Sequence, residues 1–104
     1  MKSANRAEGE SLAVLVRIPT PLQRLTDGER EVRVEQGTVA SVIEELEAKF
    51  PGMRERVIDD SGEIRRFVNI YVEEEDVRFL SGLATEVADG VEVSIVPAVA
   101  GGSL

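Results

Sequence analysis

The sequence contains no cysteine and no histidine in its 104 residues. The lack of cysteine excludes disulfides, zinc–thiolate sites, iron–sulfur clusters and thiol nucleophiles. The lack of histidine removes the usual general base and the commonest metal ligand. Basic residues are also few, because 12 Lys and Arg stand against 20 Asp and Glu, and a net charge of −8 offers no basic surface for nucleic acid. The composition argues against an ordinary enzyme and predicts no bound metal and no nucleic-acid partner.

Long apolar runs are missing as well. No stretch approaches the roughly 20 apolar residues that span a bilayer, and no signal-peptide pattern opens the chain. A cytoplasmic protein without a membrane partner is therefore expected. The hydrophobic fraction of 42% supports one modest core and hence one small domain. We expect a disordered leader at 1–10, a folded domain at 11–96, and a flexible carboxyl-terminal tail at 97–104.

The first half of the folded part predicts a hairpin. Apolar side chains alternate from residue 12 to residue 18 with the period of a strand. Pro19 and Pro21 end this strand, since proline has no backbone donor for a sheet. Asp27-Gly28 is a turn signal, and residues 30–35 alternate again. These two strands are expected to pair.

A helix follows the hairpin. Thr38 is suited to be its N-cap, and Pro51-Gly52 ends it. One helical stripe is apolar and is expected to pack on the sheet: Val39, Val42, Ile43, Leu46 and Phe50. Acidic residues on the opposite side are expected to face water: Glu44, Glu45 and Glu47.

The second half contains two strong strand patterns and several short elements. The expected order is a long polar connection at 53–66, a strand at 67–72, an acidic turn at 73–76, a short return strand at 77–79, a helical turn at 83–88 and a final strand at 91–96. A hairpin, one main helix and further strands predict an α+β protein of the β-grasp (ubiquitin-like) class, with a mixed sheet wrapping one main helix.

Two acidic clusters could suggest a metal or an acid–base site. Glu73–Asp76 are consecutive, so their side chains diverge, and the run lacks the alternating ligands and the glycine of a cation-binding loop. Asp59 and Asp60 have no second pair of carboxylates at a defined spacing. Both clusters are interpreted as solvated turns.

The carboxyl end has an unusual composition. Pro97 halts the last strand, and the small residues after it lead to Gly101-Gly102. Two glycines lose much entropy when ordered, so the segment is a poor structural element. Without Cβ atoms, however, it could enter a channel too narrow for side chains. From Pro97 to Gly102 an extended chain reaches on the order of 20 Å. The alternative is an inert, glycine-rich tail.

Several strings of the sequence resemble a known family. They are Arg66–Val72 (RFVNIYV), Glu75–Phe79 (EDVRF), Gly82–Thr85 (GLAT), Ala88–Gly90 (ADG) and Pro97–Gly102 (PAVAGG). Together they are similar to the ubiquitin-like sulfur carriers, which include the thiazole-biosynthesis carrier and the small subunit of molybdopterin synthase (ThiS/MoaD type). The specific match covers about residues 64–102, and the string from Phe67 to Phe79 favours the carriers of cysteine biosynthesis.

The resemblance implies a protein substrate and no enzyme. In the family, an adenylating enzyme of the ubiquitin-activating type (MoeB/ThiF-like) uses ATP to activate the terminal Gly-Gly carboxylate, and a sulfur donor converts it to a thiocarboxylate. The sulfur then passes to a PLP-dependent cysteine synthase or another sulfur-accepting synthase. Carried over, Gly102 holds the thiocarboxylate, and a partner's channel receives the segment before it: Pro97, Ala98, Val99, Ala100 and Gly101. The carrier itself binds no cofactor.

One feature departs from the family pattern. Ser103-Leu104 follow the two glycines, so Gly102 has no free carboxylate while they remain. A precursor is therefore expected, cut between Gly102 and Ser103 by a peptidase such as a JAMM-type metalloprotease. Four alternatives stay open: loss of the family activity, a stand-alone β-grasp interaction module, a molybdopterin-synthase-type small subunit, and protein conjugation through Gly102.

Overall fold

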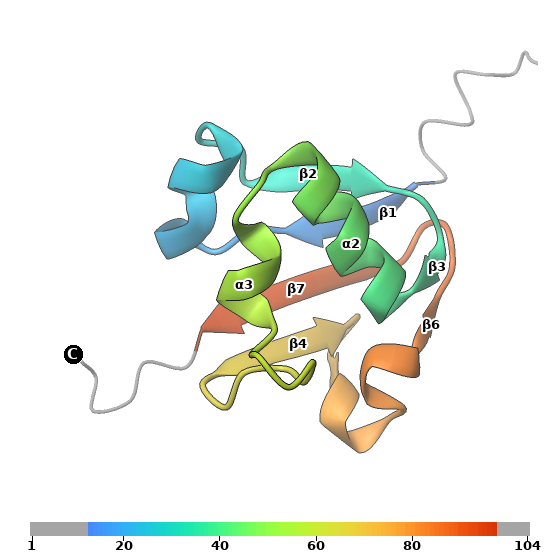
Figure 1. Cartoon of the computed structure of the whole chain (residues 1–104). Helices are drawn as coiled ribbons and strands as arrows, with labels where there is room; N and C mark the ends of the chain where they lie inside the picture. Colours follow the sequence, from blue (N-terminus) through green and yellow to red (C-terminus); the bar gives the residue numbers. More distant parts are fainter. Residues whose placement is uncertain (1–12, 98–104) are drawn as a thin grey trace, which may run out of the picture.

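The computed structural model describes residues 13–97. The predicted leader at 1–10, and the tail beyond Pro97, lie outside the described residues. Figure 1 shows strands forming one sheet, with helices α2 and α3 on one of its faces. The strands are β1 (Val14–Arg17), β2 (Glu31–Val34), β3 (Gly37–Thr38), β4 (Val68–Val72), β5 (Glu75–Asp76), β6 (Glu86–Val87) and β7 (Glu92–Pro97). The helices are α2 (Val39–Lys49) and α3 (Met53–Val57), with 3₁₀ helices η1 (Thr20–Thr26), η2 (Val77–Phe79) and η3 (Gly82–Ala84).

The main sheet is mixed and has five strands in the order β2-β1-β7-β4-β5. β1 and β2 pair antiparallel as the predicted hairpin, with Val16 opposite Val32. β7 lies in the centre, parallel to β1 and antiparallel to β4. β3 and β6 form a separate two-stranded sheet. The predicted β-grasp arrangement is confirmed.

One face of the sheet and the apolar stripe of α2 form the core. Alternate residues of the three central strands are buried, among them Val16, Ile70 and Val93. The stripe of α2 meets them with four buried side chains: Val39, Val42, Ile43 and Leu46. Phe50, the fifth predicted member, is the C-cap residue of α2 and is half-buried against the core. The helical period in the sequence therefore identified the packed face of α2 correctly.

Thr38 is the N-cap of α2, as predicted. Its hydroxyl accepts the Ser41 N–H at 3.2 Å, and the Ser41 hydroxyl accepts the Thr38 N–H at 2.9 Å. This reciprocal capping box satisfies two backbone donors at the start of the helix. It fixes where the chain turns from β3 into α2.

Two helices that the sequence patterns did not predict lie on either side of α2. The prolines at 19 and 21 end β1 but also begin η1, because proline tolerates the first turn of a helix. The stretch after Pro51, predicted as a polar connection, contains α3. Met53, Val57 and Ile58 are buried and pack into the core. The helical spacing of these three apolar residues was the signal for α3, but the charged residues between them made it easy to overlook.

Several boundaries differ in the second half. β4 begins at Val68 and not at residue 67, and β5 takes the last two residues of the turn predicted at 73–76. Residues 77–79 form η2, and the return strand is β5 before it. The expected helical turn at 83–88 is split into η3 and β6, because β6 pairs with β3. The final strand runs from Glu92 to Pro97 and includes the proline.

Candidate functional site

The candidate site is the carboxyl-terminal tail, and its described part is the end of β7. β1 pairs with β7 only as far as Ser94, while β4 follows β7 to its last residue, where Val68 lies opposite Pro97. Val93 and Ile95 are buried and hold β7 in the core. The tail therefore leaves the domain from an anchored central strand.

Two exposed apolar residues lie next to this point, Val96 before Pro97 and Phe67 before Val68, the strand partner of Pro97. The side chain of Val96 is 41% exposed and that of Phe67 is 53% exposed. The guanidinium of Arg66 lies over the Phe67 ring, with its carbon 5.6 Å from the ring centroid. We call Phe67, Val96 and Pro97 the tail base. The sequence predicts both residues inside strands, and their exposure was missed. Val96 lies on the outer face of β7, as the alternation along a strand allows, whereas Phe67 lies in the turn before β4, which begins at Val68 and not at residue 67.

Of the predicted site residues, only Pro97 lies within the described part of the chain. The others lie outside it: Ala98, Val99, Ala100, Gly101, Gly102 and Ser103. Their assigned roles as channel segment, thiocarboxylate carrier and processing site stay predictions.

The acidic run at 73–76 has a structural role, but only Glu73 and Glu74 form the turn, because Glu75–Asp76 form β5. Glu73 has a left-handed backbone (φ 60°), and its carboxylate accepts the Glu92 N–H at 2.9 Å. Asp76 caps η2 by accepting the Arg78 N–H at 2.8 Å. These contacts tie the run to β7 and η2 and leave its carboxylates in structural roles. Within residues 13–97, no group of three or more acidic side chains is arranged to hold a metal ion.

Asp59 also organises a loop. Its Oδ1 accepts the N–H of Glu63 at 3.0 Å and the hydroxyl of Ser61 at 2.8 Å. The Glu63 N–H, followed by the Ser61 hydroxyl, lowers the pKa of Asp59 below its ordinary value. Asp60 is exposed beside it. A carboxylate held in its ionised form by local donors is a turn residue and a poor general acid.

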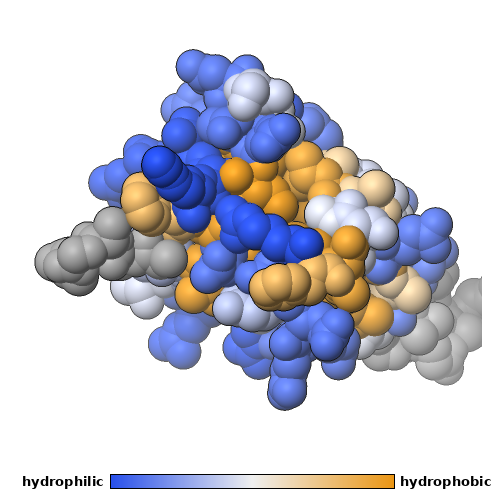
Figure 2. All heavy atoms as spheres, turned by 90° about the horizontal axis from the view of Figure 1, so that it is seen from below, coloured by the Kyte–Doolittle hydropathy of each residue, from blue (hydrophilic) through white to orange (hydrophobic). Residues whose placement is uncertain are grey.

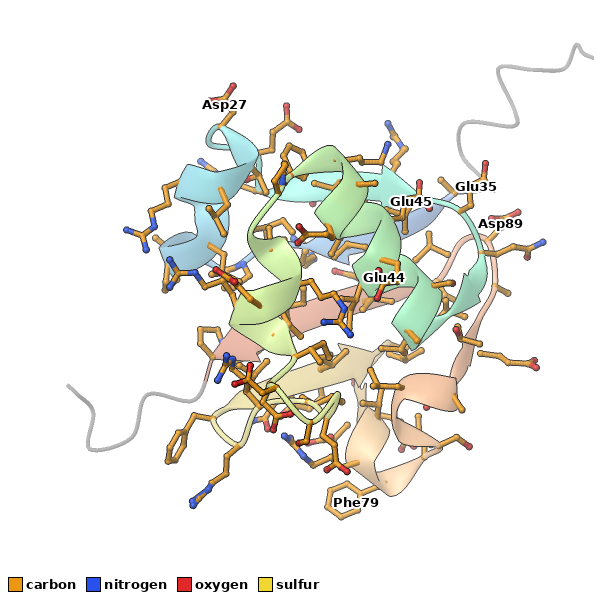
Figure 3. The ribbon with its side chains drawn as sticks, viewed as in Figure 1. Asp27, Glu35, Glu44, Glu45, Phe79 and Asp89 are labelled. Carbon is orange, nitrogen blue, oxygen red and sulfur yellow. The ribbon has the colours of Figure 1, made fainter. Side chains whose placement is uncertain are left out.

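Two acidic residues of α2 bind backbone groups, which corrects the expectation that they simply face water. Glu47 accepts the Arg54 N–H at 2.8 Å and the Gly52 N–H at 3.2 Å, and these bonds, that to Arg54 first, lower the pKa of Glu47. Glu45 accepts the Glu35 N–H at 3.0 Å. Glu44 is exposed as predicted, and Figure 3 shows it near Glu45 on α2. These carboxylates fix the start of α3 and the end of β2.

None of the helices between residues 13 and 97 has the length and apolar character needed to cross a membrane.

The fold places this chain among the ubiquitin-like β-grasp proteins, and comparison with known proteins gives its family. Residues 16–102 match the ThiS family. This match covers most of the sequence, so the chain belongs to the ThiS family.

Individual relatives agree with this assignment. The sulfur carrier protein CysO of Mycobacterium tuberculosis is 53% identical over 91 residues, which are 86% of this chain and 98% of that protein. Its crystal structure has a TM-score of 0.79 at 51% identity, covering 83% of this chain and 99% of that one. A chain of the BexX/CysO complex of Amycolatopsis orientalis has a TM-score of 0.81 at 44% identity, covering 86% and 100%. Small archaeal modifier protein 3 of Haloferax volcanii is 41% identical over 68 residues, which are 65% of this chain and 73% of that protein.

These matches confirm the predicted resemblance, the β-grasp fold and the assignment to the sulfur carriers. The family match ends at Gly102, so Ser103 and Leu104 lie beyond it.

Proposed function

We propose that this chain carries sulfur as a thiocarboxylate on Gly102, and that the bond between Gly102 and Ser103 is cut first. The observation that carries the proposal is the family match, which runs through the Gly-Gly pair and ends on Gly102. The 53% identity to CysO, a sulfur carrier protein, supports the same function. The anchored end of β7 supplies a fixed point from which the tail can enter a partner's site.

The chemistry requires activation by an outside enzyme. A terminal carboxylate has a pKa of about 3.5, so it is ionised at pH 7 and is a poor electrophile. An adenylating enzyme of the ubiquitin-activating type transfers AMP from ATP to a carboxylate oxygen and releases pyrophosphate. Hydrosulfide, delivered by a sulfur donor, then attacks the acyl carbon. A C–S bond forms, the C–O bond to AMP breaks, and no oxidant or reductant is needed.

The composition of the chain suits this reaction. An activated acyl group reacts readily with thiols, and the sequence contains no cysteine. No internal thiolate can therefore capture the activated carboxyl of Gly102. The carrier supplies the reacting carboxylate, and the partners supply the catalytic groups.

Cleavage before charging follows from the covalent structure. While Gly102 is joined to Ser103, its carbonyl belongs to an amide and has no oxygen that can accept AMP. A peptidase, in our proposal a JAMM-type metalloprotease, hydrolyses this amide and produces the carboxylate. Release of the residues after Gly102 would then control when the carrier becomes active.

The sulfur acceptor is a second partner. CysO of A. orientalis is found in a complex with BexX, so that carrier binds a further protein. For this chain we propose a PLP-dependent cysteine synthase, or another sulfur-accepting synthase, as the protein that receives the thiocarboxylate. An acidic carrier with a net charge of −8 fits basic docking surfaces on its partners.

The proposal is tested by charging the purified chain. A version ending at Gly102, incubated with the adenylating enzyme of the source organism, ATP and sulfide, should gain about 16 Da, the difference between sulfur and oxygen. Intact-mass spectrometry measures this gain. The version that retains Ser103 is the matched control and should keep its mass.

Other outcomes contradict the proposal in different ways. No gain for the version ending at Gly102 means that the chain is not charged. A gain for the version retaining Ser103 means that the sulfur is bound at a site other than the Gly102 carboxyl.

The likeness to a small archaeal modifier protein favours protein conjugation as a second candidate function of the same carboxyl. Conjugation would produce high-mass adducts that resist reducing agents, with no thiocarboxylate.

A further inference from the structure

Phe79, at the end of η2, is the most exposed large apolar side chain in the described part of the chain. Its side chain is 85% exposed, compared with 43% for the neighbouring Leu80. Figure 3 shows the ring pointing away from the domain. Sequence reasoning expected a strand here and gave Phe79 no role. A large aromatic side chain kept in water is a typical anchor for binding another protein.

The backbone that presents Phe79 is fixed on several sides. Arg78 donates from Nη1 to the Asn69 side chain and from Nη2 to the Arg65 carbonyl, both at 2.8 Å. Asp76 caps the start of η2, and Val77 is fully buried. The ring is thus held on a rigid support. A preorganised anchor loses less conformational entropy on binding, which favours a docking role.

A hollow lies beside this projecting ring. It has a volume of about 340 Å³, and Ile64 and Leu83 supply its apolar lining, while Arg78 and Glu63 supply its charged lining. Figure 2 views this side of the molecule and shows several apolar patches, which a band of hydrophilic residues across the middle of the face separates. A projecting ring next to a hollow forms a shape that another surface can match. We call Phe79, Leu80 and this hollow the η2 surface.

The charge of this chain indicates what kind of partner surface complements the η2 surface. The chain carries a net charge of −8, so a second copy would meet it with like charge. Glu63 lines the hollow, and the acidic turn at 73–76 directly precedes η2. The guanidinium of Arg78 is already bonded within the domain. An apolar pocket bordered by Lys or Arg side chains is the complementary partner surface.

The η2 surface is linked to the tail base through β4. Arg78 bonds to Asn69, and Asn69 lies opposite Val96 in the register of β4 and β7. The next pair along the ladder is Val68 with Pro97, the last described residue before the tail. A protein that holds the tail can therefore contact this part of the domain at the same time.

We propose that Phe79 is the docking anchor for the adenylating enzyme, which receives the ring in an apolar pocket bordered by basic side chains while it holds the tail. The identity of this partner rests on the proposed function. The adenylating enzyme is chosen because activation of the Gly102 carboxyl precedes every later transfer of sulfur.

Steady-state kinetics of pyrophosphate release test this inference. The substrate is the version ending at Gly102, and the enzyme is the adenylating enzyme of the source organism at saturating ATP. Phe79→Ser should raise the KM for the carrier about 10- to 30-fold, the loss expected for a buried aromatic anchor, with kcat within about twofold. Phe79→Trp should restore the KM, because it keeps an aromatic anchor.

Phe67→Ser is the comparison variant, since it makes the same change at another exposed phenylalanine, one that belongs to the tail base. The increase in KM for Phe67→Ser should be at least about fivefold smaller than the increase for Phe79→Ser, because hot-spot energy is concentrated in few residues. Equal increases would mean that Phe79 contributes no more to docking than the tail base does and would overturn the inference. An unchanged KM for Phe79→Ser would also overturn it.

Two further measurements keep the outcomes distinct. Amide resonances of Phe79 and Leu80 in the unsubstituted carrier should shift or broaden when the enzyme is added, which tests the contact without any variant. Sedimentation should show a monomer, and a dimer that Phe79→Ser dissociates would overturn the choice of partner.

If the unsubstituted carrier is not adenylated at all, the proposed function fails. If it is adenylated and Phe79→Ser behaves identically, only the docking inference fails.

Discussion

Replacing Gly101 with Val in the version that ends at Gly102 should lower kcat/KM for adenylation at least about 100-fold, the loss that a displacement of about 1 Å at a reacting centre produces. The reason is steric. A residue without a Cβ can pass through a channel that fits little more than the backbone, and Val adds a branched side chain directly before the reacting carboxyl. The measurement is pyrophosphate release, with intact mass as a second readout of charging.

The comparison variant is Ala98→Val, which adds a branched side chain in the same tail but farther from the reacting carboxyl. It should retain activity within about tenfold of the parent, because catalytic losses grow as the displacement approaches the reacting atom. Neither substitution should change the unfolding temperature, because the core cluster lies between Val14 and Ile95. Full activity of Gly101→Val would show that the tail does not enter a narrow channel.

Leu46→Ala should produce a large loss of stability. Leu46 is fully buried on the face of α2 that packs on the sheet. Truncating such a side chain removes apolar burial and leaves a cavity, which costs about 2–5 kcal/mol of the free energy of unfolding. Small domains have only about 5–15 kcal/mol in total. Urea unfolding followed by circular dichroism measures the change, since the sequence has no tryptophan and one tyrosine.

Leu80→Ala is the control for this substitution, because it makes the same chemical change at a side chain that is 43% exposed. It should cost less than about 1 kcal/mol, as substitutions at exposed sites usually do. If Leu46→Ala costs no more than Leu80→Ala, α2 does not pack as described. At a temperature where the Leu46 variant remains folded, its charging should match the parent, since its defect lies in stability.

The main elements were predictable because each has a strong local pattern. The stripe of α2 has the helical period, and Thr38 is a cap residue at the required position. The alternation in β1, β4 and β7 has the strand period and identifies the residues that face the core.

Elements defined by tertiary packing were not predictable in the same way. α3 is only five residues long, so its helical structure depends on packing against the core more than on intrinsic helix propensity. β6 is a two-residue strand that exists because it pairs with β3. Arg78, the residue before the exposed Phe79, bonds to groups 9 and 13 residues away in sequence. A local sequence pattern cannot predict contacts between residues that are far apart in the chain.

The candidate site was recognised from a different kind of signal. The Gly-Gly pair stood out in the sequence because two glycines beyond the last predicted strand have no side chains that could pack. The family match now covers this pair and ends with it. The docking role of the η2 surface required the structure, because it depends on exposure and on a neighbouring hollow.

Sulfur carriage on Gly102 can be observed in the mass of the carboxyl-terminal peptide of the protein isolated from its own cells. We expect a peptide that ends at Gly102, with a fraction heavier by about 16 Da that loses this increment when treated with a thiol-alkylating reagent and hydrolysed. A peptide that retains Ser103 in all molecules, with no sulfur on Gly102, would contradict this expectation.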